Sequence, residues 1–334
     1  MPSPLPLLPL PIDSTNLPGK LVKTNALRFQ HGWSAMTVML LASLRAQSAP
    51  LDVPALRARI TGGDSAAQYQ LGRALLRGEG VARSLPEALA LLKSAAEAGN
   101  DEAKGAYGFM IAKGMAVPMD EAAGFEWIRQ SAAAGVPASK LNLGIMTLKG
   151  QGTPADQAAG LKLMKEAAVL GNVDAQVRLA ETYFFGENGV AKSPEQAAIW
   201  SLKAAEGGNA WAQNLTGTMK EHAMGMPGDL TGAAGFYRKA AEQGDAKAQA
   251  NLGRLLFNGL AGERDPVHAY YWLKGSMDQG EITARNFLLE IQAAFSEAQI
   301  NQAKALAEKN PPPQQTRRRR AGTKGPWLPH PTPD

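Results

Sequence analysis

The chain repeats itself at a nearly constant interval. A glycine closes a similar stretch of sequence at Gly99, Gly135, Gly171, Gly208, Gly244 and Gly280. Self-similarity at a period of about 20–50 residues is typical of solenoids, in which each unit packs on its neighbours. The sequence therefore predicts six repeats, over residues 64–99, 100–135, 136–171, 172–208, 209–244 and 245–280.

Each repeat contains two helical patterns, which we term helix A and helix B. In helix A of the first repeat, Ala67 and Leu71 are four residues apart and lie on one face. A glycine stands in the middle of five of the six A helices, as Gly72 and Gly144 do, although it costs about 1 kcal/mol there relative to Ala. We therefore expect helix B to approach closely at these glycines, so that Gly144→Leu destabilises the array.

One position of helix B is always large. Its occupants are Leu91, Trp127, Leu163, Trp200, Phe236 and Trp272. A large residue that recurs in phase favours a wedge between neighbouring repeats over a ligand box. The sequence thus predicts an all-α array with packing residues at this position.

The first 49 residues read as a leader. Lys20, Lys23 and Arg28 precede an apolar stretch at residues 33–44, and small residues follow it at Ala46 and Ser48. This order is typical of a secretory signal peptide, here near residues 20–48, and the stretch is too short to span a bilayer. We expect a periplasmic or secreted protein. A short helix packed on the repeats and an organelle transit peptide are alternatives, and a cytoplasmic protein follows if the leader is a start-site artefact.

The remaining segments outside the array have distinct compositions. Residues 50–63 are expected to form an N-terminal cap, and residues 281–310 C-terminal capping helices that cover the last hydrophobic face. Residues 311–334 are rich in proline and charge, which predicts a disordered basic tail. Residues 1–50 carry +3 and residues 310–334 carry +4 of the total charge of +5, which leaves −2 for residues 51–309. The predicted folded body thus has no compositional mark of a nucleic-acid surface.

The repeats resemble a known family. Residues 67–72 (Ala-Gln-Tyr-Gln-Leu-Gly), residues 77–81 (Arg-Gly-Glu-Gly-Val) and residues 95–100 (Ala-Ala-Glu-Ala-Gly-Asn) closely resemble the Sel-one-like repeat (SLR), a relative of the tetratricopeptide repeat. The resemblance covers residues 64–280. It implies a right-handed α-solenoid of helix–turn–helix units with capping helices, and a scaffold that binds proteins or components of the cell envelope. One branch of the family is disulfide-rich and linked in part to β-lactam binding, but this chain has no cysteine.

The sequence offers little chemistry. The absence of cysteine excludes disulfides and thiolate metal sites. The four histidines, His31, His222, His268 and His330, form no metal-binding pattern. Glycine pairs such as Gly78 and Gly80 lack the lysine and the preceding strand of a phosphate loop, and no nucleophile–base pattern appears. We therefore predict no catalytic residue, no cofactor, no metal and no enzymatic activity.

A binding groove is expected along the concave face, which helix A lines in solenoids. By analogy with tetratricopeptide repeats, we project four positions of each repeat onto it. The partner-binding candidates are Tyr69, Arg73, Phe109, Ile145, Leu148, Phe184 and Phe185. The apolar members would suit an amphipathic peptide or helix. The alternative is that these side chains pack helix A against helix B.

Three functions remain open on the sequence. The first is an exported scaffold or adaptor that binds protein or peptide partners. The second is a cell-envelope hydrolase directed at β-lactams or wall material, which the absent catalytic pattern disfavours. The third is a regulatory binder that makes weak contacts with an anionic polymer or lipid through Arg317, Arg318, Arg319 and Arg320.

Overall fold

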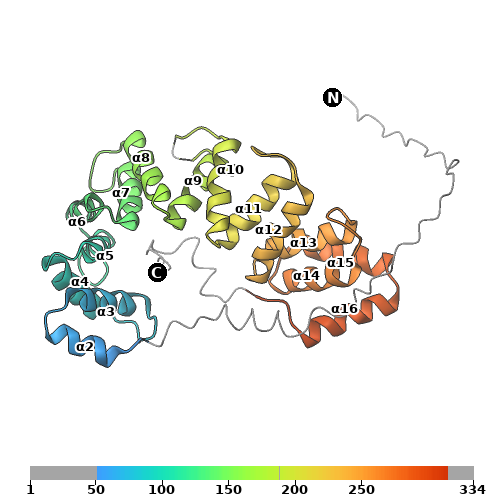
Figure 1. Cartoon of the computed structure of the whole chain (residues 1–334), viewed down its shortest axis with the longest axis horizontal. Helices are drawn as coiled ribbons and strands as arrows, with labels where there is room; N and C mark the ends of the chain where they lie inside the picture. Colours follow the sequence, from blue (N-terminus) through green and yellow to red (C-terminus); the bar gives the residue numbers. More distant parts are fainter. Residues whose placement is uncertain (1–50, 188, 315–334) are drawn as a thin grey trace, which may run out of the picture. The chain divides into compact units, whose positions relative to one another are not determined.

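The computed structural model describes residues 51–187 and 189–314. The predicted leader and the arginine run at residues 317–320 lie outside these residues. The unit that begins at Leu51 is built of consecutive helices (Figure 1). These are α2 (Val53–Thr61), α3 (Ser65–Arg77), α4 (Leu85–Glu97), α5 (Asp101–Ala112), α6 (Glu121–Ala133), α7 (Pro137–Lys149), α8 (Gln157–Val169), α9 (Val173–Phe185), α10 (Pro194–Glu206), α11 (Ala210–Glu221), α12 (Leu230–Glu242), α13 (Ala246–Asn258), α14 (Pro266–Asp278), α15 (Ile282–Ala294) and α16 (Glu297–Lys309).

All six predicted A–B pairs are present among the described residues, so the all-α repeat solenoid is confirmed. Helix A is α3, α5, α7, α9, α11 or α13, and helix B is the helix that follows it. Each A helix packs most extensively on its own B helix, and each B helix then packs on the next A helix. A helices also touch directly across repeats at α3–α5, α5–α7 and α7–α9. The core therefore runs continuously through the array rather than lying at one centre.

Short sequence signals start and stop the helices. A side-chain oxygen at the N-cap accepts a backbone N–H in most A helices, at Asp64, Asn100, Asn172, Asn209 and Asp245. Val136, at the start of α7, makes no such bond. The closing glycine just before each cap is left-handed, with φ of +91° at Gly135, and an added Cβ there would meet nothing within 4 Å. This glycine is needed for its backbone conformation and not for space.

The mid-helix glycines serve a different purpose. A Cβ added to Gly144 would lie 2.8 Å from the carbonyl oxygen of Gly160 in α8, and one added to Gly108 would lie 2.8 Å from that of Gly124 in α6. The two helices of these repeats therefore touch backbone to backbone. The expected close approach of helix B is confirmed.

The large residues of helix B pack between repeats, as expected. Trp127 packs against a cluster built largely from the first repeat, and Leu163 against residues of the second and third repeats. Phe236 and Trp272 likewise contact clusters of the preceding repeat. The large position of helix B thus ties each of these repeats to the one before it.

The C-terminal end departs from the repeat pattern. Helix α16 packs on α14, in place of pairing with α15 as a B helix would. Pro312 is buried against Gly275, and the carbonyl oxygen of Pro313 accepts a 2.6 Å hydrogen bond from Gln249. This requires a correction to the expected tail at residues 311–334, because its first residues are packed on the array. The rest of the tail, from residue 315, lies outside the described residues.

Candidate functional site

The mid-helix glycine fixes which side of helix A faces helix B. Positions in every A helix are numbered here by their equivalents in the first repeat. Successive residues of an α-helix are rotated by about 100° about its axis. Position 76 therefore lies about 40° from the glycine at position 72, whereas positions 70 and 77 lie about 160° and 140° from it. Contacts confirm this geometry, because a Cβ on Gly160 of α8 would meet both Gly144 and Leu148, and Leu148 is the third-repeat equivalent of Leu76. The side of the A helices opposite helix B is therefore formed around positions 70 and 77. We call it the A-helix face.

The predicted partner-binding residues divide according to this rotation. Leu148 and Phe184 are the equivalents of Leu76 in the third and fourth repeats and turn toward helix B. Leu148 is buried, with 8% of its surface exposed. Tyr69 lies about 60° around the helix from Gly72 and is half-buried. The guanidinium carbon of Arg73 lies over its ring, 5.7 Å from the ring centroid. Arg73 and its third-repeat equivalent Ile145 are half-buried. The second-repeat equivalent, Phe109, is buried, with 4% of its surface exposed. Side chains as buried as Phe109 and Leu148 present little area to a partner.

Phe185 is the predicted residue that the structure places openly on this face. It is the last residue of α9, and 52% of its surface is exposed. Its ring stands edge-on to that of Phe184, with the centroids 5.0 Å apart. A large exposed aromatic side chain, rigidly held by a second ring, is a suitable anchor for a binding partner.

Phe185 belongs to a row with one residue from the end of each A helix. The row consists of Arg77, Lys113, Lys149, Phe185, His222 and Asn258. Apart from Arg77, all of them are exposed. The projection from the sequence placed Lys113 and Lys149 in the groove as equivalents of Arg77, but did not select them as partner-binding candidates. We call the row of six residues, from Arg77 to Asn258, the C-terminal row.

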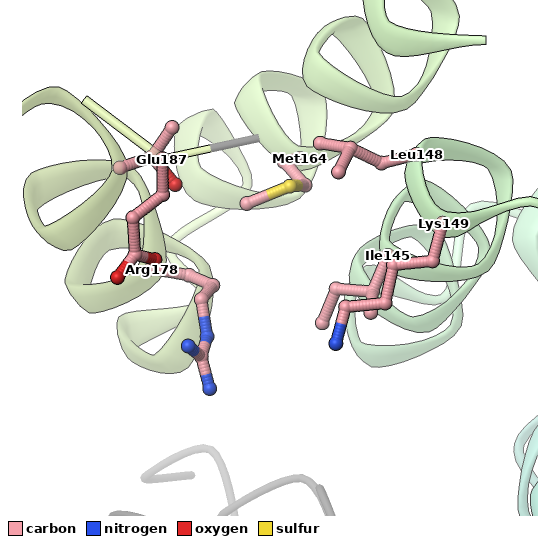
Figure 2. Close-up of a pocket in the computed structure, with 7 residues that line it drawn as sticks. Ile145, Leu148, Lys149, Met164, Arg178 and Glu187 are labelled. Carbon is pink, nitrogen blue, oxygen red and sulfur yellow. The ribbon is translucent and has the colours of Figure 1, made fainter. Parts of the chain in front are cut away.

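A small pocket opens beside the row, between the third and fourth repeats. Its volume is about 100 Å³, and its lining comes from α7, α8, α9 and the residues after α9: Ile145, Leu148, Lys149, Met164, Arg178, Thr182 and Glu187. Figure 2 shows the ammonium group of Lys149 and the guanidinium of Arg178 on opposite sides of it. The pocket thus combines an apolar wall with cations from two neighbouring repeats.

The charges on α9 are partly desolvated. Arg178 Nη1 lies 3.0 Å from Glu181 Oε2, and about a quarter or less of each side chain is exposed. Burial raises the pKa of Glu181, against the opposing effect of Arg178. Burial also lowers the pKa of Arg178, against the opposing effects of Glu181, Glu187 and Asp174. Desolvation therefore outweighs attraction for both partners, so this pair is no strong source of stability.

The charges of the fifth and sixth repeats are engaged with one another. Glu221 of α11 accepts a hydrogen bond from Arg254 of α13, and its other oxygen accepts one of 2.9 Å from the Tyr237 hydroxyl of α12. Asn251 donates to Asn214 at 3.1 Å. These side chains tie α11, α12 and α13 together.

Two searches of the described residues were negative. Within residues 51–187 and 189–314, no three His, Cys, Asp or Glu side chains are grouped to hold a metal ion. In the same part of the chain, no helix has the length and apolar character needed to cross a membrane.

Comparison with known proteins places these features in a family. The chain matches the model of the Sel1 repeat at residues 65–100, 102–136, 137–172, 173–209, 212–245 and 246–280. No curated protein matches it. A crystal structure of a Sel1 repeat protein from Oxalobacter formigenes is similar, with 27% identity, a TM-score of 0.61 and 75% of each chain covered.

Two further structures align less well. A protective antigen of uropathogenic Escherichia coli with an SLR fold has 25% identity, a TM-score of 0.32, and coverage of 84% of this chain and 75% of the other. An immunity protein from Pseudomonas aeruginosa has 19% identity, a TM-score of 0.42, and coverage of 75% and 88%. With TM-scores below 0.5, neither bears on the function of this chain. The six matched repeats span well over half of the sequence, and the chain therefore belongs to the Sel1 repeat family.

Proposed function

We propose that the chain is a non-enzymatic scaffold or adaptor that binds a protein or peptide through the A-helix face. The observation that carries this proposal is Phe185, an exposed aromatic residue at the end of α9 on the side of helix A opposite helix B. Burial of such a side chain at an interface contributes about 1.5–3 kcal/mol. Membership of a repeat family whose solenoids present extended binding surfaces supports the same conclusion.

The proposal is tested with peptides selected by display on the full chain. Phe185→Ser should weaken the binding of the selected peptides by roughly tenfold or more, because a buried anchor is lost. The matched control is Ile199→Ser, which removes a comparably exposed apolar side chain (46%) from helix B of the fourth repeat. This control should change the dissociation constant by less than about twofold. Equal losses in both variants, or a loss in the control alone, would contradict the use of the A-helix face.

We also propose that the protein is exported to the periplasm or secreted. The support is the order of basic, apolar and small residues near residues 20–48. Residues 1–50 fused to alkaline phosphatase, an enzyme that is active only outside the cytoplasm, should yield activity and a processed product. An inactive, unprocessed fusion would instead indicate a cytoplasmic protein.

A further inference from the structure

The A-helix face of the first three repeats is basic at one edge. The C-terminal row there consists of Arg77, Lys113 and Lys149, with Arg73 one turn before the first of them. Helices α3 and α7 contain no acidic residue. In α5 the acids are confined to the first turn, where Glu102 lies eleven residues before Lys113, or about 16 Å along the helix axis. The positive charge at this edge is therefore not cancelled by acids in the same helices.

The cations of this edge have little internal compensation. Lys113 and Lys149 form no ion pair with any residue in the described ranges. The Arg77 side chain is only 8% exposed, and its contact with Glu79 is long, at 3.6 Å. Its Nη2 atom is buried without a hydrogen-bond partner among the described residues. Arg77 is therefore too buried to present its charge to a partner, and the accessible cations of this edge are Lys113 and Lys149.

The character of the face changes at the fourth repeat. The row continues with Phe185, and the pocket beside Lys149 has an apolar wall that includes Ile145 and Met164. Glu181 and Glu187 also appear here. A ligand that follows the row therefore meets cations first and then an apolar site near acids, which would repel further negative charge.

We propose that the partner is an extended acidic peptide segment with one large apolar side chain at one end. Its carboxylates pair with Lys113 and Lys149, and its apolar side chain lies against Phe185 or in the adjacent pocket. Packed helices lie about 8–10 Å apart, and three residues of an extended chain span about 10 Å. Two acidic residues that are three positions apart therefore match Lys113 and Lys149. The inference rests on the proposed function and adds the chemistry of the partner to it.

A peptide fits these features better than a single-stranded nucleic acid does. Nucleic acids also combine charge with groups that stack on aromatic rings. A base stacked on Phe185, however, would bring its phosphate close to Glu181 and Glu187, whereas a peptide can place neutral residues there. The net charge of −2 on residues 51–309 likewise gives no long-range attraction for a polyanion.

The test uses the full chain and a defined fluorescent peptide. In this peptide two Glu residues are three positions apart, Phe follows three residues after the second Glu, and Ser and Gly fill the remaining positions. A peptide of reversed order and a scrambled peptide accompany it, because the direction of binding is open. The double variant Lys113→Glu/Lys149→Glu is compared with Lys162→Glu, which reverses an exposed charge on helix B of the third repeat. Fluorescence anisotropy gives each dissociation constant.

The double variant should raise the dissociation constant of the matched or the reversed peptide by about tenfold or more. The control variant Lys162→Glu should change that constant by less than about twofold. The scrambled peptide should bind more weakly than the better of the two ordered peptides. If Phe185→Ser weakens the binding of display-selected peptides but the double variant leaves their dissociation constants unchanged, the acidic partner is wrong and the proposed function stands. If no peptide binds, from display or from design, both are wrong. Tighter binding of a single-stranded RNA of equal charge would overturn the peptide in favour of nucleic acid.

Discussion

At the scale of single residues, the glycines of the array do two separate jobs. Gly135 adopts a left-handed backbone with open space around it, whereas Gly144 is helical and touches the backbone of α8. Gly235 in α12 does neither, because an added Cβ there would meet nothing within 4 Å and its φ is not positive. The three positions therefore predict different outcomes for the same substitution.

Gly144→Ala should destabilise the protein by about 1–3 kcal/mol, because the added methyl group separates α7 from α8. Gly235→Ala should stabilise it by about 0.5–1 kcal/mol, because alanine is the better helix former and has room. Urea unfolding of the two variants measures both free energies. A neutral Gly144→Ala would show that the close approach of the helices does not require glycine.

At the scale of the helices, the N-caps predict where stability can be gained. Asn172 caps α9 by accepting a 2.8 Å hydrogen bond from the Ala175 N–H, but Val136, with a similar backbone at the start of α7, cannot. Val136→Asn should therefore raise the free energy of unfolding by about 0.5–1 kcal/mol, and Asn172→Ala should lower it by about 1 kcal/mol. Thermal unfolding of both variants checks the pair. A destabilised Val136→Asn would mean that packing of the valine outweighs the missing cap.

The helices also mark how far sequence reasoning reached. The repeats, the A–B pairing and the role of the mid-helix glycines could be predicted, because each depends on contacts that recur in phase. The binding face was located less well, since positions such as Leu148 were projected by analogy and in fact turn toward helix B. Lys149 was projected onto the same groove, and only rotation from Gly144 separates it from Leu148. The packing of Pro312 on Gly275 had no repeating signal, because it occurs once, at the end of the array.

At the scale of the whole described unit, each repeat contacts mainly its neighbours, and clusters of buried residues link them in series. Residues that recur build this series, while residues that differ along the C-terminal row give each repeat its own surface. The central claim is that recognition takes place on this varying row of the A helices and not on the B helices.

Hydrogen–deuterium exchange of the full chain, with and without a display-selected peptide, tests that claim most directly. Bound peptide should slow amide exchange in the last turns of α5, α7 and α9, around Lys113, Lys149 and Phe185, and leave α6, α8 and α10 unchanged. Slowed exchange confined to the B helices, with those three turns unaffected, would contradict the account.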